Sequence, residues 1–464
     1  MTENEKRAKK EISRHLEKMM PNSHEISKRN AQILPHEIVN TVILPYPFYV
    51  QKAEGSRIWD VDGNEYIDLT AGFGPILLGH SPEVLVDAVK NQINAGADFG
   101  LTSPLQGKLA ELLIEASPCA EMVNFSNSGT EATMEALRLA RAHTGKTRYA
   151  IFTGSYHGVH DAALIEADKN SDQHAPTGRS KFGALGIPQY IIDQALILPY
   201  RDDAAFDLIR QHKEDLAVVM IEPVQSSNPR TDVGPFLQEL RNVCRESGVL
   251  FMFDEVITGM RIGGMGGAQA FFDVKPDLAT YGKVIGGGHP VGAVAGPADI
   301  MNTYKVIFSG GTFSGNPLTM ASGAAVLNYL KTHPEVYPHM AEQSNRLTKE
   351  VNKFLVQEDM NVRMMNAQSL FSFVFTKMPV ESGWDVAKIK YDFQPSLFYS
   401  FLHKNGVVIP GLHLFFITAA HTADDIDISG STKLRVDIVT QFLRPGLIER
   451  ISSKKSLKKQ FSQS

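Results

Sequence analysis

The chain has 464 residues, enough for two to four ordinary domains with buried cores of their own. Its 46 lysine and arginine residues against 51 aspartate and glutamate residues give a net charge of −5, which argues against a broad cationic surface for nucleic acid. Two cysteines, Cys119 and Cys244, are too few for a disulfide scaffold or a four-ligand zinc site. We therefore expect core cysteines, no metal, and a cytoplasmic enzyme.

The first 45 residues predict a helical segment, in which residues 1–20 form an exposed or docking helix. These residues lack the apolar stretch of a signal peptide, and no run in the chain approaches the roughly 18 apolar residues of a membrane span. Residues 46–80 alternate polar and apolar side chains around Asp62-Gly63-Asn64, which predicts an antiparallel hairpin. We assign this hairpin to a smaller domain.

Residues 81–330 predict a large domain. Amphipathic helical stretches alternate there with short apolar runs such as RYAIFTG, LAVVMIEPV, VLFMFDEVI and PVGAVAG. Such runs favour an α/β fold whose mostly parallel sheet is covered by helices on both faces. Residues 331–464 contain mostly helical patterns and two scattered strand patterns, FSFVFTKM and KLRVDIV, and they end in a basic tail. They predict the rest of a smaller α+β domain.

Asp254 follows directly after the apolar run that predicts a central strand. An ionised carboxylate is costly in an apolar interior, so we expect Asp254 to face solvent or a fixed cation at the carboxyl end of its strand. Open α/β sheets bind their ligands at these strand ends. The alternative is an aspartate that caps the next helix.

Lys283 precedes three glycines, Gly286, Gly287 and Gly288. Glycines let the backbone come close to a bound group, and burial would lower the pKa of the lysine amine and make it nucleophilic toward carbonyls. A lysine in an exposed loop is the alternative.

Three further segments carry polar groups that suit a phosphorylated ring. Ser128-Gly129-Thr130 opens an amphipathic helix, whose first amides suit a phosphate, although a plain helix cap is the alternative. Tyr156 offers a flat face beside His157, and Thr312 lies among glycines before a helix start. An acid, a lysine, an aromatic ring and a phosphate cradle together indicate pyridoxal phosphate.

The chain resembles the class III (subgroup II) pyridoxal-phosphate aminotransferases of fold type I. The resemblance covers residues 46–330 and 406–427 and rests on NSGTEATMEALRLAR, YHG, EPV, FDEVITG, PDLATYGKVIGGGHPVGAVAG and GGTFSGNP. GGAQAFF and AAHTADDID make it similar to glutamate-1-semialdehyde aminomutases and to the aminotransferase domains of polyketide and peptide synthetases.

This resemblance implies roles for twelve residues. Lys283 would bind the cofactor as a Schiff base and carry a proton, and Asp254 would pair with the pyridine nitrogen. The other implied cofactor contacts are the phosphate ligands Ser128, Gly129 and Thr130, the ring neighbours Tyr156, His157 and Val256, and the edge residues Glu222, Ser227 and Asn228. Thr312 would reach the phosphate of a neighbouring subunit, which implies a homodimer with shared active sites.

Two departures from the aminomutase pattern concern the substrate. No arginine lies between Arg29 and Arg57, where aminomutases carry an SPVR-like stretch, and His413 stands near the place of a glutamate. We therefore expect intermolecular transfer from an amino-acid donor to a ketone or aldehyde, free or carrier-bound, with the cavity lined by Tyr46–Tyr49 and Leu412–Phe416. The alternatives are an aminomutase, with Arg230 or Arg261 as the carboxylate clamp, a pyridoxal-phosphate racemase or decarboxylase, and a non-catalytic scaffold.

Overall fold

The computed structural model describes residues 3–35, 46–181, 184–381, 385, 389, 395–409 and 414–429. Its centre is a seven-stranded sheet in the order β4-β12-β11-β10-β9-β5-β8. β12 runs antiparallel to both of its neighbours, and the strands from β11 to β8 run parallel to one another. The predicted, mostly parallel sheet is therefore confirmed. In sheet order, the strands are β4 (Met122–Ser126), β12 (Gly292–Gly296), β11 (Leu278–Gly282), β10 (Leu250–Asp254), β9 (Leu216–Ile221), β5 (Arg148–Phe152) and β8 (Ala195–Leu198).

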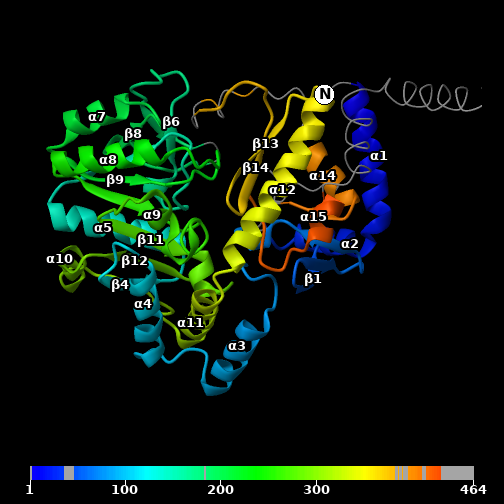
Figure 1. Cartoon of the computed structure of the whole chain (residues 1–464), viewed down its shortest axis with the longest axis horizontal. Helices are drawn as coiled ribbons and strands as arrows, with labels where there is room; N and C mark the ends of the chain where they lie inside the picture. Colours follow the sequence, from blue (N-terminus) through cyan, green and yellow to red (C-terminus); the bar gives the residue numbers. More distant parts are fainter. Residues whose placement is uncertain are drawn as a thin grey trace, which may run out of the picture.

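Helices cover both faces of this sheet, as Figure 1 shows. Alternate side chains of the fully buried strand β9 point to opposite faces, because successive residues of a strand do so. Val218 packs in the cluster that contains α5, and Val219 packs in the cluster that contains α7 and α8. The helices of this region are α3 (Glu83–Ala95), α4 (Pro104–Ala116), α5 (Gly129–Thr144), α6 (Gln189–Gln194), α7 (Ala204–His212), α8 (Gly234–Ser247), α9 (Gly267–Phe272), α10 (Ala298–Met301) and α11 (Pro317–Thr332).

The short elements of this region lie mainly in its connections. β6 (Ile165–Ala167) and β7 (Gly178–Ser180) form an antiparallel pair. Single 3₁₀ turns complete the list: η1 (Ala71–Phe73), η2 (Asp161–Ala163), η3 (Gly264–Gly266), η4 (Lys283–Gly286) and η5 (Asn302–Lys305).

The N-terminal hairpin pairs with a strand from the far end of the chain. β1 (Val50–Glu54), β2 (Arg57–Asp60) and β3 (Glu65–Asp68) form the predicted antiparallel unit around Gly63, and β15 (Val407–Val408) adds to it in parallel. A second sheet contains β13 (Arg363–Ala367), β14 (Leu370–Val374) and β16 (Phe415–Phe416), beside α12 (Val336–Gln357), α14 (Pro395–Lys404) and α15 (Ala423–Ser429). The predicted strand KLRVDIV and the basic tail lie outside the described residues, and the domain boundaries stay predictions.

The first helix docks on this smaller region. α1 (Glu3–Met19) and α2 (Pro21–Asn30) precede the hairpin, and α1 packs against α14 (Figure 1). Ile12 and Leu16 are fully buried, and Asp62 of the hairpin turn accepts a hydrogen bond from the amide of Asn22. None of the helices in the described ranges is long and apolar enough to cross a membrane. Cys119 and Cys244 are free and buried, as predicted.

Candidate active site

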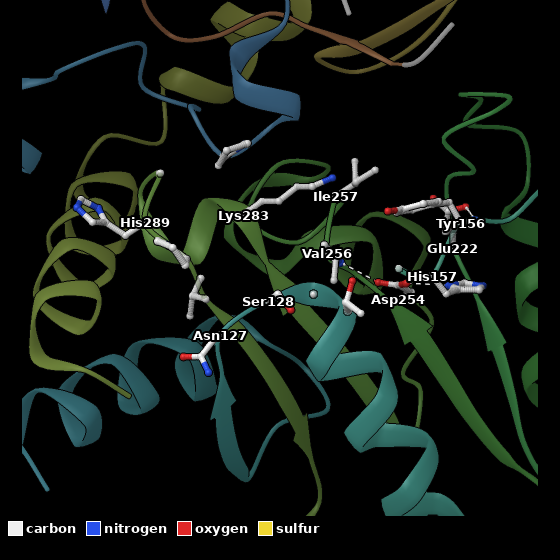
Figure 2. A pocket seen from close by; sticks show the side chains of 17 residues that line it. Asn127, Ser128, Tyr156, His157, Glu222, Asp254, Val256, Ile257, Lys283 and His289 are labelled. Atoms are coloured by element: carbon white, nitrogen blue, oxygen red, sulfur yellow. Dashed lines mark hydrogen bonds and ion pairs between the residues drawn. The ribbon is translucent and has the colours of Figure 1, made fainter. Parts of the chain in front are cut away.

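A cavity of about 410 Å³ opens at the carboxyl ends of neighbouring strands. Asp254 ends β10, Lys283 follows β11, Glu222 follows β9, and Tyr156 lies in the loop after β5. In Figure 2 Lys283 extends across the cavity, while the other three side chains gather at one side with His157. Nine of the twelve predicted residues line it: Ser128, Gly129, Thr130, Tyr156, His157, Glu222, Asp254, Val256 and Lys283.

Asp254 is a buried carboxylate with three hydrogen-bond partners. Its Oδ2 lies 2.7 Å from His157 Nδ1, which must carry the proton because a carboxylate can only accept. Its Oδ1 accepts from Thr280 Oγ1 at 3.1 Å and from the amide of Val256 at 3.2 Å. The carboxylate therefore lies on the cavity wall in a fixed orientation and caps no helix, so the alternative interpretation is wrong.

Lys283 begins η4 with a φ of +50°, in the left-handed region. The glycines that follow are required by space, since a Cβ on Gly286 would lie 2.6 Å from Val291 Cγ1, and one on Gly287 would lie 2.8 Å from Val326 Cγ2. Burial and the charge of Arg261 lower the pKa of Lys283 to about 8, against the opposing effect of Asp254 and Glu222. A much larger fraction of the amine is therefore neutral near pH 7 than for an ordinary lysine, and the exposed-loop alternative is wrong.

Glu222 is buried, and burial raises the pKa of its carboxyl. Its Oε2 accepts a hydrogen bond of 2.8 Å from the amide of Tyr156, which fixes the backbone from which the tyrosine ring projects. Tyr156 is 49 % exposed, and the ammonium of Lys181 lies 5.5 Å from the centroid of its ring. Tyr156 therefore presents a flat surface at the cavity.

The segment Ser128-Gly129-Thr130 forms the predicted start of a helix. Ser128 is the N-cap of α5, and its Oγ accepts from the amide of Glu131 at 3.1 Å. A Cβ on Gly129 would lie 2.8 Å from Val256 Cγ1, and one on Gly158 would lie 2.7 Å from Thr130 Oγ1. Only glycine lets the backbone pass this closely, and the first turn of a long helix attracts anions. The capping alternative is therefore correct for Ser128, and the phosphate cradle at this helix start stays a prediction.

Three predicted residues do not line the cavity. Ser227 Oγ donates to the carbonyl of Gly154 at 2.9 Å. Asn228 is fully buried, and its side-chain atoms have no hydrogen-bond partner among the described residues. Thr312 is exposed in the stretch between η5 and α11, next to Phe313, which is 60 % exposed. The predicted contact of Thr312 is with the phosphate of a neighbouring subunit, so this contact stays a prediction.

The residues that line the cavity differ from those that the sequence predicted for the substrate side. Tyr46 stacks on His24, and Phe48 packs against Tyr66 and His403, so the prediction that Tyr46–Tyr49 line the cavity is wrong for these two side chains. Leu414–Phe416 do not line it either, and Leu412 and His413 lie outside the described residues. The residues that do line it and were not predicted are Pro75, Asn127, Gly158, Ile257, Gly288, His289, Pro290 and Val291.

Most of the lining residues that were not predicted lie next to predicted site residues in the sequence, and this proximity could have identified them. Ile257 follows Val256, and His289 and Pro290 follow the glycine run. Pro75 comes from the segment after the N-terminal hairpin, and no pattern in the sequence connects that segment with Lys283.

Neither arginine suggested as a carboxylate clamp lines the cavity. Arg230 pairs with Asp232 and donates to the carbonyl of Val380 at 2.9 Å. Arg261 is 2 % exposed and binds neutral acceptors. In the described structure both guanidinium groups are occupied elsewhere.

A carboxylate and a lysine at neighbouring strand ends, beside a helix start, define a fold type I pyridoxal-phosphate enzyme. The family model of Aminotransferase class-III matches residues 39–420, so the chain belongs to this family. It is 36% identical to a glutamate-1-semialdehyde 2,1-aminomutase of Methanosarcina acetivorans over 423 residues, 87% of this chain and 96% of the relative.

Solved structures give the same fold. An omega-transaminase from Sphaerobacter thermophilus is 30% identical, with a TM-score of 0.83 over 90% of this chain and 97% of that one. A beta-phenylalanine aminotransferase from Variovorax paradoxus is 28% identical, with a TM-score of 0.81 over 94% of this chain and 97% of that one. The chain is therefore a pyridoxal-phosphate-dependent aminotransferase or aminomutase.

The residues present fit this cofactor. The cavity offers an amine of lowered pKa, a buried carboxylate, an exposed aromatic face and a helix start where added Cβ atoms would collide. His157 also keeps one buried nitrogen, Nε2, without a partner among the described residues. This set suits an aldehyde, a ring nitrogen, a flat ring and a phosphate, which are the four functional parts of pyridoxal phosphate.

Proposed function

We propose that the cavity transfers an amino group between carbon atoms. The observation that supports this proposal is the placement of Lys283 and Asp254, from neighbouring strand ends, in one cavity that fits pyridoxal phosphate. The bound cofactor supplies an electron sink for negative charge at the substrate carbon. Lys283 holds the cofactor's aldehyde carbon and, once released, carries a proton at its Nζ from the substrate carbon. Its lowered pKa suits both tasks, since only the neutral amine can attack or accept a proton.

The remaining residues bind and orient the cofactor. Asp254 keeps the pyridine nitrogen protonated, and His157 and Thr280 hold this carboxylate in place. The start of α5 binds the phosphate through Ser128, Gly129 and Thr130, Tyr156 and Val256 pack against the ring, and Glu222 lies at its edge. Ser227 and Asn228 do not line the cavity, and Ser227 binds the carbonyl of Gly154 in the loop before Tyr156.

An intramolecular transfer of the glutamate-1-semialdehyde aminomutase type is the first candidate reaction. The similarity to curated aminomutases, such as the 36% identity over 87% of this chain, supports it more than it supports the intermolecular transfer expected from the sequence. In this reaction both the amino group and its destination belong to one molecule.

Intermolecular transfer to a neutral carbonyl acceptor is the second candidate, and one observation favours it. Among the described residues that line the cavity no arginine occurs, and the new lining residues Pro75, Ile257 and Val291 are apolar. A substrate carboxylate buried without a partner would lose affinity, so a ketone, an aldehyde or a carrier-bound thioester would fit better.

We also propose that two copies of the chain complete each site. The stretch around Thr312 exposes large apolar side chains, with Val306 and Phe308 at 83% and 87% exposure. Exposed apolar groups of this size mark interaction surfaces, and a two-fold partner is the commonest kind. Thr312 would then reach the phosphate bound by the neighbouring copy.

A comparison of substrates decides between the two reactions. Purified holoenzyme is incubated with glutamate-1-semialdehyde, and in parallel with neutral ketones, aldehydes and acyl thioesters, each with and without an amino-acid donor. Formation of 5-aminolevulinate without a donor would establish the aminomutase reaction. Turnover of a neutral acceptor only when a donor is present would establish intermolecular transfer, and no amino transfer with any of them would contradict both.

A further inference from the structure

Arg261 is a buried cation whose hydrogen-bond acceptors are neutral. Its side chain is 2 % exposed, and in the described ranges no carboxylate forms an ion pair with it. Its Nε has no hydrogen-bond partner there, and burial lowers the pKa of its guanidinium to about 10. A buried charge without a counter-ion is costly, and an apolar side chain of similar size would fill the space without that cost. The charge itself therefore calls for an explanation.

The guanidinium joins segments that lie far apart in the sequence. It donates to the carbonyl of Gly74 at 2.7 Å, to Ser369 Oγ at 3.1 Å and to the carbonyl of Ile417 at 3.3 Å. Its Cζ also lies 5.1 Å from the centre of the Phe416 ring. Arg261 itself follows β10, the strand that ends in Asp254. It thus ties the N-terminal segment and the β14–β16 region to the wall of the cavity.

Gly74 is the link between Arg261 and Lys283. Its φ is +109°, and a Cβ at this position would lie 3.5 Å from Lys283 Cδ and 3.0 Å from Phe416 Cε1. The Gly74 backbone thus lies beside the side chain of Lys283, about one methyl group away from contact, and Arg261 holds the Gly74 carbonyl. A shift of the guanidinium would move the backbone that borders the lysine.

We propose that Arg261 is a positioning residue for Lys283: its guanidinium fixes the backbone beside the lysine and keeps a positive charge near the lysine amine. This inference rests on the proposed role of Lys283. The charged groups that act on Lys283 are Asp254, Glu222 and Arg261. Both carboxylates favour the ammonium form, and Arg261 opposes them. Removing the positive charge should therefore make Lys283 harder to deprotonate.

The test measures the titration of Lys283 itself and does not depend on turnover. The full-length chain, freed of cofactor, is pulse-labelled with acetic anhydride across a pH series, and peptide mass spectrometry gives the labelling rate of Lys283. For the native sequence we expect an apparent pKa of about 8. For Arg261→Met we expect this pKa to rise, so that labelling of Lys283 near neutral pH falls about threefold to tenfold. Arg261→Lys keeps the charge and should restore most of the native labelling.

A matched control separates charge from stability. Arg230 also binds a distant segment, through the carbonyl of Val380, but it does not act on Lys283. Arg230→Met should lower the melting temperature while the Lys283 titration stays unchanged. The proposal would be overturned if the pKa of Lys283 were unchanged in Arg261→Met. It would also be overturned if this pKa rose as much in Arg261→Lys as in Arg261→Met. If Arg261→Met fails to fold, Arg261→Lys and Arg261→Gln make the same comparison. Because labelling needs no catalysis, a failure here is distinct from a failure of the proposed function.

Discussion

Two parts of the candidate site differ in how much of them a single chain supplies. The strand-end part around Asp254, His157 and Glu222 is buried, and hydrogen bonds within the chain orient its carboxylates. The stretch around Thr312 is exposed, and it includes the large, exposed apolar residues Val306, Phe308 and Phe313. This difference indicates that one subunit by itself orients the side chains proposed to act in the reaction. We expect a second subunit to contribute only to the binding of the cofactor.

The largest effect is expected for Lys283→Ala. Without the amine, turnover should fall by about 10³-fold or more, while the fold is largely kept, because Lys283 is the one lysine among the described residues that line the cavity, and its amine is needed both to attack the aldehyde and to carry the proton. Steady-state assays and circular dichroism check both parts.

Lys181 provides the matched control for this assignment. Its ammonium lies near Tyr156, and burial lowers its pKa too, so it is the lysine most easily confused with Lys283. Borohydride reduction of the holoenzyme followed by peptide mass mapping should place the cofactor on Lys283. Finding it on Lys181 would refute the assignment.

Asp254→Asn should reduce turnover by about 10²-fold or more with cofactor still bound, since a neutral amide does not hold the pyridine proton as a carboxylate does. Glu255→Gln is the control from the next residue. Glu255 is equally buried but binds Thr258 and the amides that begin α9, so its loss should reduce the free energy of unfolding and spare the rate per folded enzyme. Near-normal turnover of Asp254→Asn would exclude the proposed role.

The pH dependence of cofactor uptake should follow the lowered pKa of Lys283. The neutral amine is the reactive form, so uptake by the cofactor-free chain should rise about tenfold per pH unit up to about pH 8 and then level off. A lysine at its ordinary value of 10.5 would give a rise that continues well beyond pH 9. Stopped-flow absorbance at constant ionic strength distinguishes the two curves.

The smallest effect is expected for Thr312→Ala. Loss of one hydroxyl contact to the phosphate should weaken cofactor retention about fivefold, with the chemical step spared. Mixed dimers of Lys283→Ala and Thr312→Ala chains test whether the site is shared. If the sites are shared, one site of the mixed dimer should contain both substitutions and the other site should contain neither. If each site lies within a single chain, each site should contain one substitution.

The sequence was sufficient for the elements that depend on local patterns. The apolar runs predicted the strands of the large sheet, and Ser128 was recognised at the start of α5 because capping is a local interaction. Open α/β sheets bind ligands at the carboxyl ends of their strands, so Asp254 was expected to lie at a binding site. The residue roles carried over from the family resemblance stay predictions.

What the sequence could not give is packing between distant segments. Tyr46 and Phe48 were expected in the cavity, but each packs against aromatic rings elsewhere, and Pro75 takes a place in the lining instead. Arg261 was considered as a substrate clamp, whereas its acceptors come from Gly74, Ser369 and Ile417. No periodicity connects residues separated by more than a hundred positions.

The sequence by itself thus determined the class of chemistry, because the residue types that pyridoxal phosphate needs lie within motifs of a few residues each. The tertiary structure alone decided their environment. Burial and the neighbouring charges of Asp254, Glu222 and Arg261 shift the pKa of Lys283, and these charges come from different segments of the chain. Electrostatic effects depend on distance in space, which the order of residues does not specify.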